Sequence, residues 1–170
     1  MKYEKIPDLD LGITKEDLHL DDVLYNPYFY EQELVKVIVS PTHCIAAGSV
    51  GEMAEHVDRT VKIEGMEKLS WYLHRRCEQL AAMRNHDGPV TCHLFLARNL
   101  SDSFPEHTDP DDVVIYVVEG EKTMLVEGEE IVLRPGEALY MPHGTRHQAI
   151  NRQASIMLSF GLERYLLEKI

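Results

Sequence analysis

The pattern of apolar and polar positions changes near Asp87-Gly88-Pro89, a turn signal that divides the chain into residues 1–88 and 89–170. Before this turn, helix-like and strand-like patterns alternate. The clearest predicted element there is a helix over 66–84 with one apolar stripe. Residues 1–88 therefore predict a segment of helices and strands that packs on the second part. Shorter elements are expected at 15–20 (helix), 34–39 and 59–63 (strands), and 49–56 (helix or loop).

After the turn, short strand-like segments follow one another with Gly or Pro between them. These segments are 90–97, 113–118, 122–126, 130–133, 138–141, 147–150 and 155–160. Evenly spaced short strands with turn signals indicate a sandwich or a small barrel. The segment 113–118 is apolar on both faces, so we expect a central strand that is covered on each side.

Composition and charge narrow the class of protein. A chain of 170 residues with 44% hydrophobic content suits one domain overall. The 17 Lys and Arg against 29 Asp and Glu give a net charge of -12, so neither nucleic acid nor an anionic membrane is expected as a main partner. No apolar run approaches the roughly 18–20 residues of a membrane span. Three cysteines without C-x-x-C spacing are expected to be reduced thiols in a cytoplasmic protein.

Candidate metal ligands stand just ahead of the apolar strand. His107 and Asp109 occupy positions i and i+2, which face the same side of an extended chain. Their nitrogen and oxygen atoms would converge on one ion, and His147 would add a third ligand. Two histidines and one carboxylate form the facial triad of non-haem Fe(II) sites, which leaves three coordination positions open. From spacing alone, a surface turn before Pro110 explains His107 and Asp109 equally well.

The stretch 90–161 resembles the cupin superfamily. Every position of the second cupin motif is filled, by Gly136, Pro142, Gly144, His147 and Asn151. The resemblance implies a mainly β fold, the double-stranded β-helix of the cupin or jelly-roll barrel, over residues 89–170. Residues 1–88 would then be an N-terminal mixed α/β extension of that barrel.

The first cupin motif is present with departures. His107 and Asp109 occupy its H-x-H positions and Gly120 ends it, but Val113 stands at its glutamate position and cannot bind metal. A pattern of H-x-D, no glutamate and a distal histidine resembles the JmjC-type branch of the cupins, the Fe(II)- and 2-oxoglutarate-dependent hydroxylases. This resemblance implies that His107, Asp109 and His147 are both the Fe(II) ligands and the catalytic centre.

Lys122 is the residue that the resemblance assigns to 2-oxoglutarate as co-substrate, and Ser159 is a second candidate for contact with it. Lys122 lies where this branch places the basic residue that pairs with the distal carboxylate, and an opposite charge offsets the cost of burying a dicarboxylate. Ordinary cupins also carry a solvated lysine on this hairpin. Phe95 and Phe104 depart from the branch, because they replace side chains that contact the same carboxylate.

The sequence therefore predicts a non-haem Fe(II)- and 2-oxoglutarate-dependent oxygenase that hydroxylates a small molecule or a peptide side chain. Exposed sheet edges and the extra segment favour a homodimer. Two alternatives remain: another metal-dependent cupin, either a 2-oxoglutarate-independent dioxygenase or an isomerase, and a non-catalytic ligand-binding cupin. His93 and His143 flank the predicted site, where either could contact substrate; for His143, a turn residue, the alternative is a solvated side chain.

Overall fold

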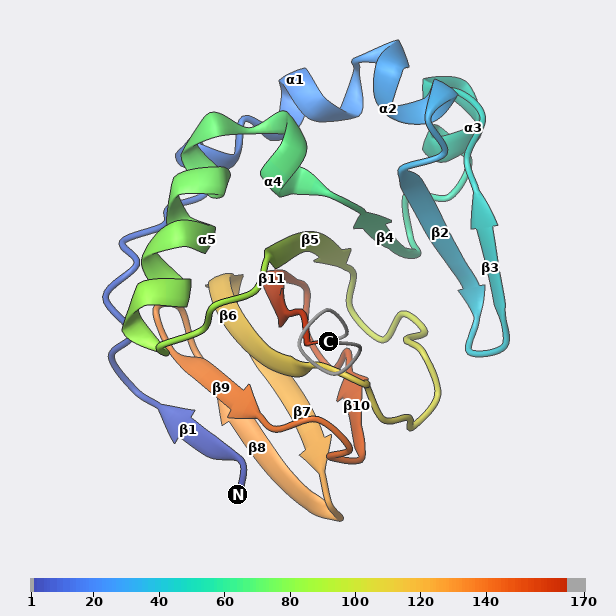
Figure 1. Ribbon diagram of the computed structural model, residues 1–170. Helices are drawn as coiled ribbons and strands as arrows, with labels where there is room; N and C mark the ends of the chain where they lie inside the picture. The colour runs from blue at the N-terminus through green and yellow to red at the C-terminus, as the bar shows by residue number, and fades with distance from the viewer. Residues whose placement is uncertain (1, 165–170) are drawn as a thin grey trace.

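The structure is a computed structural model that describes residues 2–164 (Figure 1). The elements before the Asp87–Pro89 turn are β1 (Glu4–Ile6), a 3-10 helix (Glu16–Leu18), α1 (Leu20–Leu24), α2 (Pro27–Glu31), β2 (Val35–Ser40), β3 (His43–Ala46), α3 (Val50–Ala54), β4 (Thr60–Ile63), α4 (Met66–Leu69) and α5 (Trp71–Met83). The elements after it are β5 (Val90–Ala97), β6 (Asp112–Gly120), β7 (Lys122–Val126), β8 (Glu129–Leu133), β9 (Ala138–Met141), β10 (His147–Ile150) and β11 (Ser155–Leu162).

The strands form two antiparallel sheets that pack face to face. Among residues 2–164, one sheet has eight strands in the order β1-β9-β6-β11-β5-β4-β2-β3, and the other has three in the order β10-β7-β8. All the strands expected after the turn are present, and the mainly β double-stranded β-helix is confirmed.

Strand β6 is apolar on both faces because both faces of the large sheet are covered. Val114 and Tyr116 belong to one core cluster, together with Leu73 and Leu80 of α5. The alternating β6 residues belong to a second cluster with residues of β7 and β8 on the small sheet. The expectation of a central strand covered on each side is therefore confirmed, with helices on one side and the small sheet on the other (Figure 1).

The N-terminal segment does more than pack on the barrel, because it contributes strands to the large sheet. β1 pairs with β9, and β4 pairs with β5, so the segment extends the sheet at both ends. The expected strands 34–39 and 59–63 appear as β2 and β4, and the segment 49–56 contains α3. β1 and β3 were not predicted. Within residues 2–164, no helix has the length and apolar character needed to span a membrane.

Two predicted helices are wrong in extent. The helix expected over 15–20 is interrupted at His19, whose φ of 48° is left-handed, so a 3-10 turn gives way to α1. The helix expected over 66–84 is interrupted at Ser70, which is extended. The Ser70 hydroxyl accepts a hydrogen bond from the Leu73 N–H at 3.2 Å. A side-chain cap thus starts α5 as a new helix where the apolar stripe alone indicated continuity.

Two glycines with positive φ provide a test of this packing. A Cβ atom at Gly120 (φ +76°) would lie 2.2 Å from the Ala154 carbonyl oxygen, whereas one at Gly128 (φ +81°) would meet nothing within 4 Å. We expect Gly128→Ala to cost about 1–2 kcal/mol, the strain of the left-handed conformation alone. Gly120→Ala should cost a further 1–3 kcal/mol or so, because the backbone of β11 cannot move aside freely. Urea unfolding of both variants measures this, and equal losses would contradict the close approach.

Candidate metal centre

The backbone brings the two predicted histidine ligands together. His107 and His147 form an isolated antiparallel bridge, and their backbone groups exchange two hydrogen bonds of 3.1 and 2.9 Å. Residues paired in this way point their side chains to the same face of the sheet. A hydrogen bond of 2.9 Å from the Gly144 N–H to the Asp109 carbonyl oxygen continues the contact. Segments forty residues apart are thereby held in register at the site.

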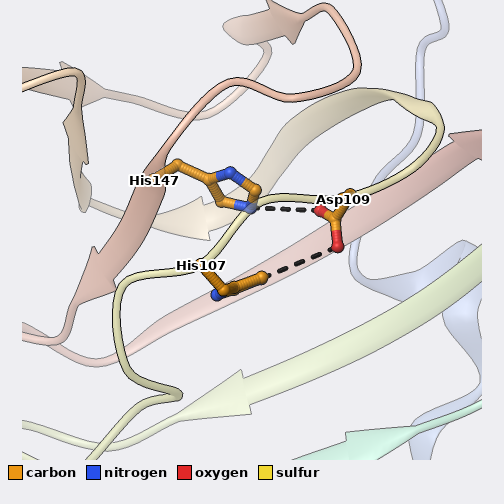
Figure 2. A group of neighbouring side chains, drawn as sticks. All are labelled: His107, Asp109 and His147. Carbon is orange, nitrogen blue, oxygen red and sulfur yellow. Dashed lines mark ion pairs between the residues drawn. The ribbon is translucent and has the colours of Figure 1, made fainter.

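Asp109 lies beside both imidazole rings and turns one carboxylate oxygen toward each of them (Figure 2). Its Oδ2 atom is 3.2 Å from Nε2 of His147, and its Oδ1 atom is 3.7 Å from Nε2 of His107. The three residues offer ligand atoms that all lie within 4.8 Å of one another. His147 is the most enclosed, with 8% of its side chain exposed, while His107 and Asp109 lie at the opening of the site.

Each histidine presents the nitrogen that a metal needs. Nδ1 of His107 lies 2.8 Å from the Pro105 carbonyl oxygen, and Nδ1 of His147 lies 2.9 Å from the Thr145 carbonyl oxygen. A carbonyl oxygen only accepts, so Nδ1 carries the proton in both rings and Nε2 keeps its lone pair in the neutral form. This orientation by a backbone carbonyl is common among histidine ligands of metals.

The charge state of the Asp109 carboxylate suits a metal. The hydrogen bond from His147 holds the pKa of Asp109 below its usual range despite burial of the carboxylate. Burial lowers the pKa of His147, but the interactions with Asp109 and the Thr145 carbonyl outweigh burial and raise it, which favours the protonated ring when no cation is bound. A metal at Nε2 would displace that proton, so metal binding here competes with protonation of His147. Ligands at roughly 2.0–2.2 Å from one ion, on adjacent corners of an octahedron, lie about 3 Å apart. The two Asp109 contacts of 3.2 and 3.7 Å are close to this spacing, so side-chain rotations would let the three residues hold a divalent ion in a facial arrangement.

All the residues predicted for the site line one cavity of about 250 Å³ between the two sheets. The triad lies on one part of its wall, Lys122 projects into it from β7, and Ser159 faces it from β11. In the β7–β8 hairpin Lys122 pairs with Leu133 through its backbone. The residue is only 2% exposed, so the solvated-lysine alternative is wrong. Ser159 lies between His93 and Ile115 in the register of the large sheet.

Lys122 is held by a neutral group. Its Nζ atom donates a hydrogen bond of 2.5 Å to Oδ1 of Asn151, and no ion pair is found for it among residues 2–164. The Asn151 amide donates in turn to Oγ1 of Thr60 at 3.1 Å and to the Ser101 carbonyl oxygen at 3.2 Å. Burial without a carboxylate partner lowers the pKa of Lys122 from 10.5 to about 8.

The two flanking histidines have different positions. His93 lines the cavity, and its Nδ1 accepts a hydrogen bond of 3.2 Å from the Gly65 N–H. Burial and the nearby Lys62 ammonium lower the pKa of His93 to about 4, so this ring is neutral. His143 is half exposed and lies against the Asp112 carboxylate at 3.1 Å, outside the residues that line the cavity.

Sequence reasoning missed the polar residues that the N-terminal segment brings to the cavity. Thr60 and Lys62 of β4 alternate with the core residues Val61 and Ile63, and both face the cavity. The strand was predicted, but which of its faces would border the site depends on the pairing of β4 with β5. Asn151 was counted as a motif position without a role.

Comparison with known families places the site in a recognised type of domain. Residues 100–160 match the family model described as "Cupin domain", so the expected resemblance to cupins is confirmed for this segment. It contains His107, Asp109, Lys122 and His147. No curated protein matches the sequence.

Among solved structures, the chain is similar to YcfD, a ribosomal oxygenase from Escherichia coli, with a TM-score of 0.69 and 14% identity. The similarity covers 98% of this chain and 50% of that one, so this chain spans about half the length of the E. coli protein. A second structure of YcfD, in complex with cobalt and succinic acid, gives a TM-score of 0.65, with the same identity and coverage. At this identity the likeness establishes a shared fold, which extends over the N-terminal segment as well as the cupin domain.

The geometry predicts that His147→Ala abolishes stoichiometric metal binding, because His147 is the most enclosed ligand and loss of one ligand leaves two at the opening. We expect at least a hundredfold weaker binding of Co(II) or Fe(II), measured by anaerobic calorimetry. His143→Ala is the matched control, since His143 lies nearby but does not contribute a ligand atom to the triad. Equal metal affinity in wild type and His147→Ala would show that the triad is not the site.

Proposed function

We propose that this cupin protein is a non-haem Fe(II)- and 2-oxoglutarate-dependent oxygenase that hydroxylates a small molecule or a peptide side chain. His107, Asp109 and His147 would hold Fe(II), and Lys122 and Ser159 would contact 2-oxoglutarate. The expected overall reaction consumes dioxygen and 2-oxoglutarate, releases succinate and CO₂, and places one oxygen atom in a C–H bond of the substrate.

The observation that carries this proposal is the buried, unneutralised Lys122 in the same cavity as the triad. An ammonium group removed from water without an anionic partner is costly, so its presence calls for an anion that the protein itself does not supply. A dicarboxylate would supply one carboxylate to Lys122 and leave the other end for the metal.

The position of Lys122 suits an elongated ligand. His147 lies opposite Val126 in the register of β10 and β7, and Lys122 lies on the same face of β7 as Val126. Four residues of strand separate these two positions, roughly 13 Å at about 3.3–3.4 Å per residue. The lysine side chain and a five-carbon dicarboxylate would together span that separation.

Each group of the cavity wall has a defined task in this proposal. Bound Fe(II) supplies dioxygen activation coupled to oxidation of the 2-oxo acid. The Asp109 carboxylate, held ionised by His147, keeps the ligand set ready, and Lys122 orients the dicarboxylate through its distal end. Apolar side chains exclude water from the space between these groups: Val113, Ile115, Met124 and Met157.

The comparisons support the proposal at the level of the fold. The E. coli oxygenase was solved with cobalt and succinic acid. Succinate is what remains of 2-oxoglutarate after oxidative decarboxylation, so a chain of this fold with a His-Asp-His cluster and a buried lysine suits 2-oxoglutarate as co-substrate. The identity of the substrate that receives oxygen rests on other parts of the cavity.

We also propose that the protein works in the cytoplasm as a homodimer. β3 is the last strand of the large sheet, and its outer edge has no strand partner within residues 2–164. An exposed sheet edge is a common place for a second copy to pair.

Lys122→Met tests the proposed co-substrate, because methionine removes the charge and keeps an unbranched side chain. We expect anaerobic titration of the metal-loaded protein to show 2-oxoglutarate binding weakened about ten- to a hundredfold, the loss of one charge-assisted hydrogen bond. Metal affinity should stay within a few fold. The variant should be at least as stable as wild type in urea, because a buried, unneutralised charge is gone.

The companion measurement is succinate release with Fe(II), 2-oxoglutarate and dioxygen in the absence of substrate. Wild type and His143→Ala should release succinate, and His147→Ala should not. Metal binding without succinate release or 2-oxoglutarate binding would favour a 2-oxoglutarate-independent metal cupin. Absence of metal binding would favour a non-catalytic ligand-binding cupin.

The lowered pKa of Lys122 predicts a pH dependence of co-substrate binding. Below about pH 8 the side chain is protonated in the ligand-free protein, and above it the ammonium is lost. A bound carboxylate favours the protonated form, so 2-oxoglutarate affinity should be highest below pH 8 and fall by up to about tenfold per pH unit above it. Lys122→Met should lack this slope, and a wild-type affinity that stays constant between pH 7 and 9.5 would contradict the assignment.

A further inference from the structure

Lys62 is a second cation of the cavity, and it comes from outside the cupin segment. It lies on β4 of the N-terminal segment, directly opposite Phe95 of β5 in the sheet register. The alternation of β4 places Lys62 in the cavity wall and its neighbours Val61 and Ile63 in the core behind the sheet. With 18% of its side chain exposed, Lys62 is a lining residue and not a solvated surface lysine.

Two aromatic rings flank the Lys62 ammonium. Its Nζ atom lies 5.7 Å from the centre of the Phe95 ring and 5.6 Å from the centre of the Phe104 ring. The two rings meet edge to face at an interplanar angle of 89°. Phe104 also contacts the ring of His107, with ring centres 6.5 Å apart. The Phe104 ring therefore contacts both the Lys62 ammonium and a residue of the triad.

The charge of Lys62 is only partly neutralised. Its partner is Glu64, at 3.6 Å, and the other carboxylate oxygen of Glu64 lies 3.6 Å from Lys36. Two ammonium groups therefore share one carboxylate. In the proposed site, Fe(II), Asp109, Lys122 and a dicarboxylate balance one another in charge, so Lys62 is left over. Asp111, the other acidic residue of the wall, forms no ion pair with Lys62 among residues 2–164; its Oδ1 accepts the Arg164 backbone N–H at 2.9 Å.

His93 adds a neutral donor beside this charge. Because its Nδ1 accepts from Gly65, the proton of the neutral ring is on Nε2. A carboxylate near Lys62 would find one ammonium, one imidazole N–H and two aromatic rings in the same part of the wall. A cationic substrate would meet like charge at this place.

We propose that Lys62 selects the primary substrate, and that this substrate is a small-molecule carboxylate with an apolar or aromatic body. The carboxylate binds at Lys62, and the apolar part lies along Phe95 and Phe104 toward the triad. This inference rests on the proposed function for the identity of the reaction. The binding of a carboxylate at Lys62 is measurable without turnover.

The probes are benzoate and its neutral counterpart benzamide, with benzylamine as the cationic counterpart. They are titrated by calorimetry into the metal-loaded protein, with and without saturating 2-oxoglutarate, under anaerobic conditions. We expect wild type to prefer benzoate over both counterparts by about tenfold or more, the effect of one charge-assisted hydrogen bond. Lys62→Gln should lose about tenfold in benzoate affinity, and Lys62→Arg should retain most of it.

Lys36→Gln is the matched control. Lys36 contacts the same carboxylate at the same distance but does not line the cavity. Lys36→Gln leaves Glu64 to Lys62 alone, so benzoate affinity should fall by much less than in Lys62→Gln, where the binding cation itself is lost. Affinity for 2-oxoglutarate should be unchanged in Lys62→Gln. All variants are compared for thermal unfolding, and Lys62→Arg keeps the test valid if the glutamine variant is unstable.

Several outcomes would overturn the inference. These are an absence of benzoate binding or of any preference for it over benzamide, tighter binding of benzylamine, and equal losses in Lys62→Gln and Lys36→Gln. A fall in 2-oxoglutarate affinity in Lys62→Gln as large as in Lys122→Met would assign Lys62 to the co-substrate instead. Failure of wild type to bind 2-oxoglutarate would contradict the proposed function but not the role of Lys62. The benzoate titration of metal-loaded protein without 2-oxoglutarate still tests that role.

Discussion

Strand β6 carries apolar side chains on both of its faces, and the rest of the architecture follows from the need to cover each of them. Helix α5 and its neighbours bury one face with Val114 and Tyr116, and the small sheet buries the other. Since two sheets that pack face to face lie about 10 Å apart, side chains shorter than their neighbours leave room between them. The cavity forms in this space, and the polar groups that enter it are therefore removed from water.

Burial gives these polar groups their chemical character. Lys122 has its pKa lowered to about 8, and His93 has its pKa lowered to about 4, because the cavity solvates charge poorly. Asp109 keeps its charge because His147 hydrogen-bonds to it. A metal triad with an ionised carboxylate and a lysine without a carboxylate partner thus occupy the same enclosed space. The uncompensated positive charge of Lys122 favours binding of an anionic ligand in this space. The hydrogen bonds of Asn151 with Lys122, Thr60 and Ser101 hold that charge at one end of the cavity.

The N-terminal segment contributes to the site as well as to the fold. By adding β4 beside β5, it places Thr60 within the network that holds Lys122, and it places Lys62 beside Phe95 and Phe104. The cupin segment supplies the candidate metal triad and Lys122, which we propose to bind the dicarboxylate, whereas the added strand supplies a second cation. Division of a site in this way would allow the chemistry to stay constant while the added strand sets which substrate is accepted.

The sequence by itself determined the local features: the strands after Pro89, the two-faced strand β6, and the motif positions of His107, Asp109 and His147. These depend on periodicity and on spacing within short segments, which the order of residues records directly. Features that depend on pairing between segments far apart in the sequence were decided only by the tertiary structure. The backbone bridge between His107 and His147 brings the triad together, and the burial of Lys122 distinguishes it from a solvated hairpin lysine. Two further features were also visible only in the structure. The helix breaks at Ser70 because a side-chain cap competes with the continuous apolar stripe. The face of β4 that borders the cavity depends on the pairing of β4 with β5, which composition does not reveal.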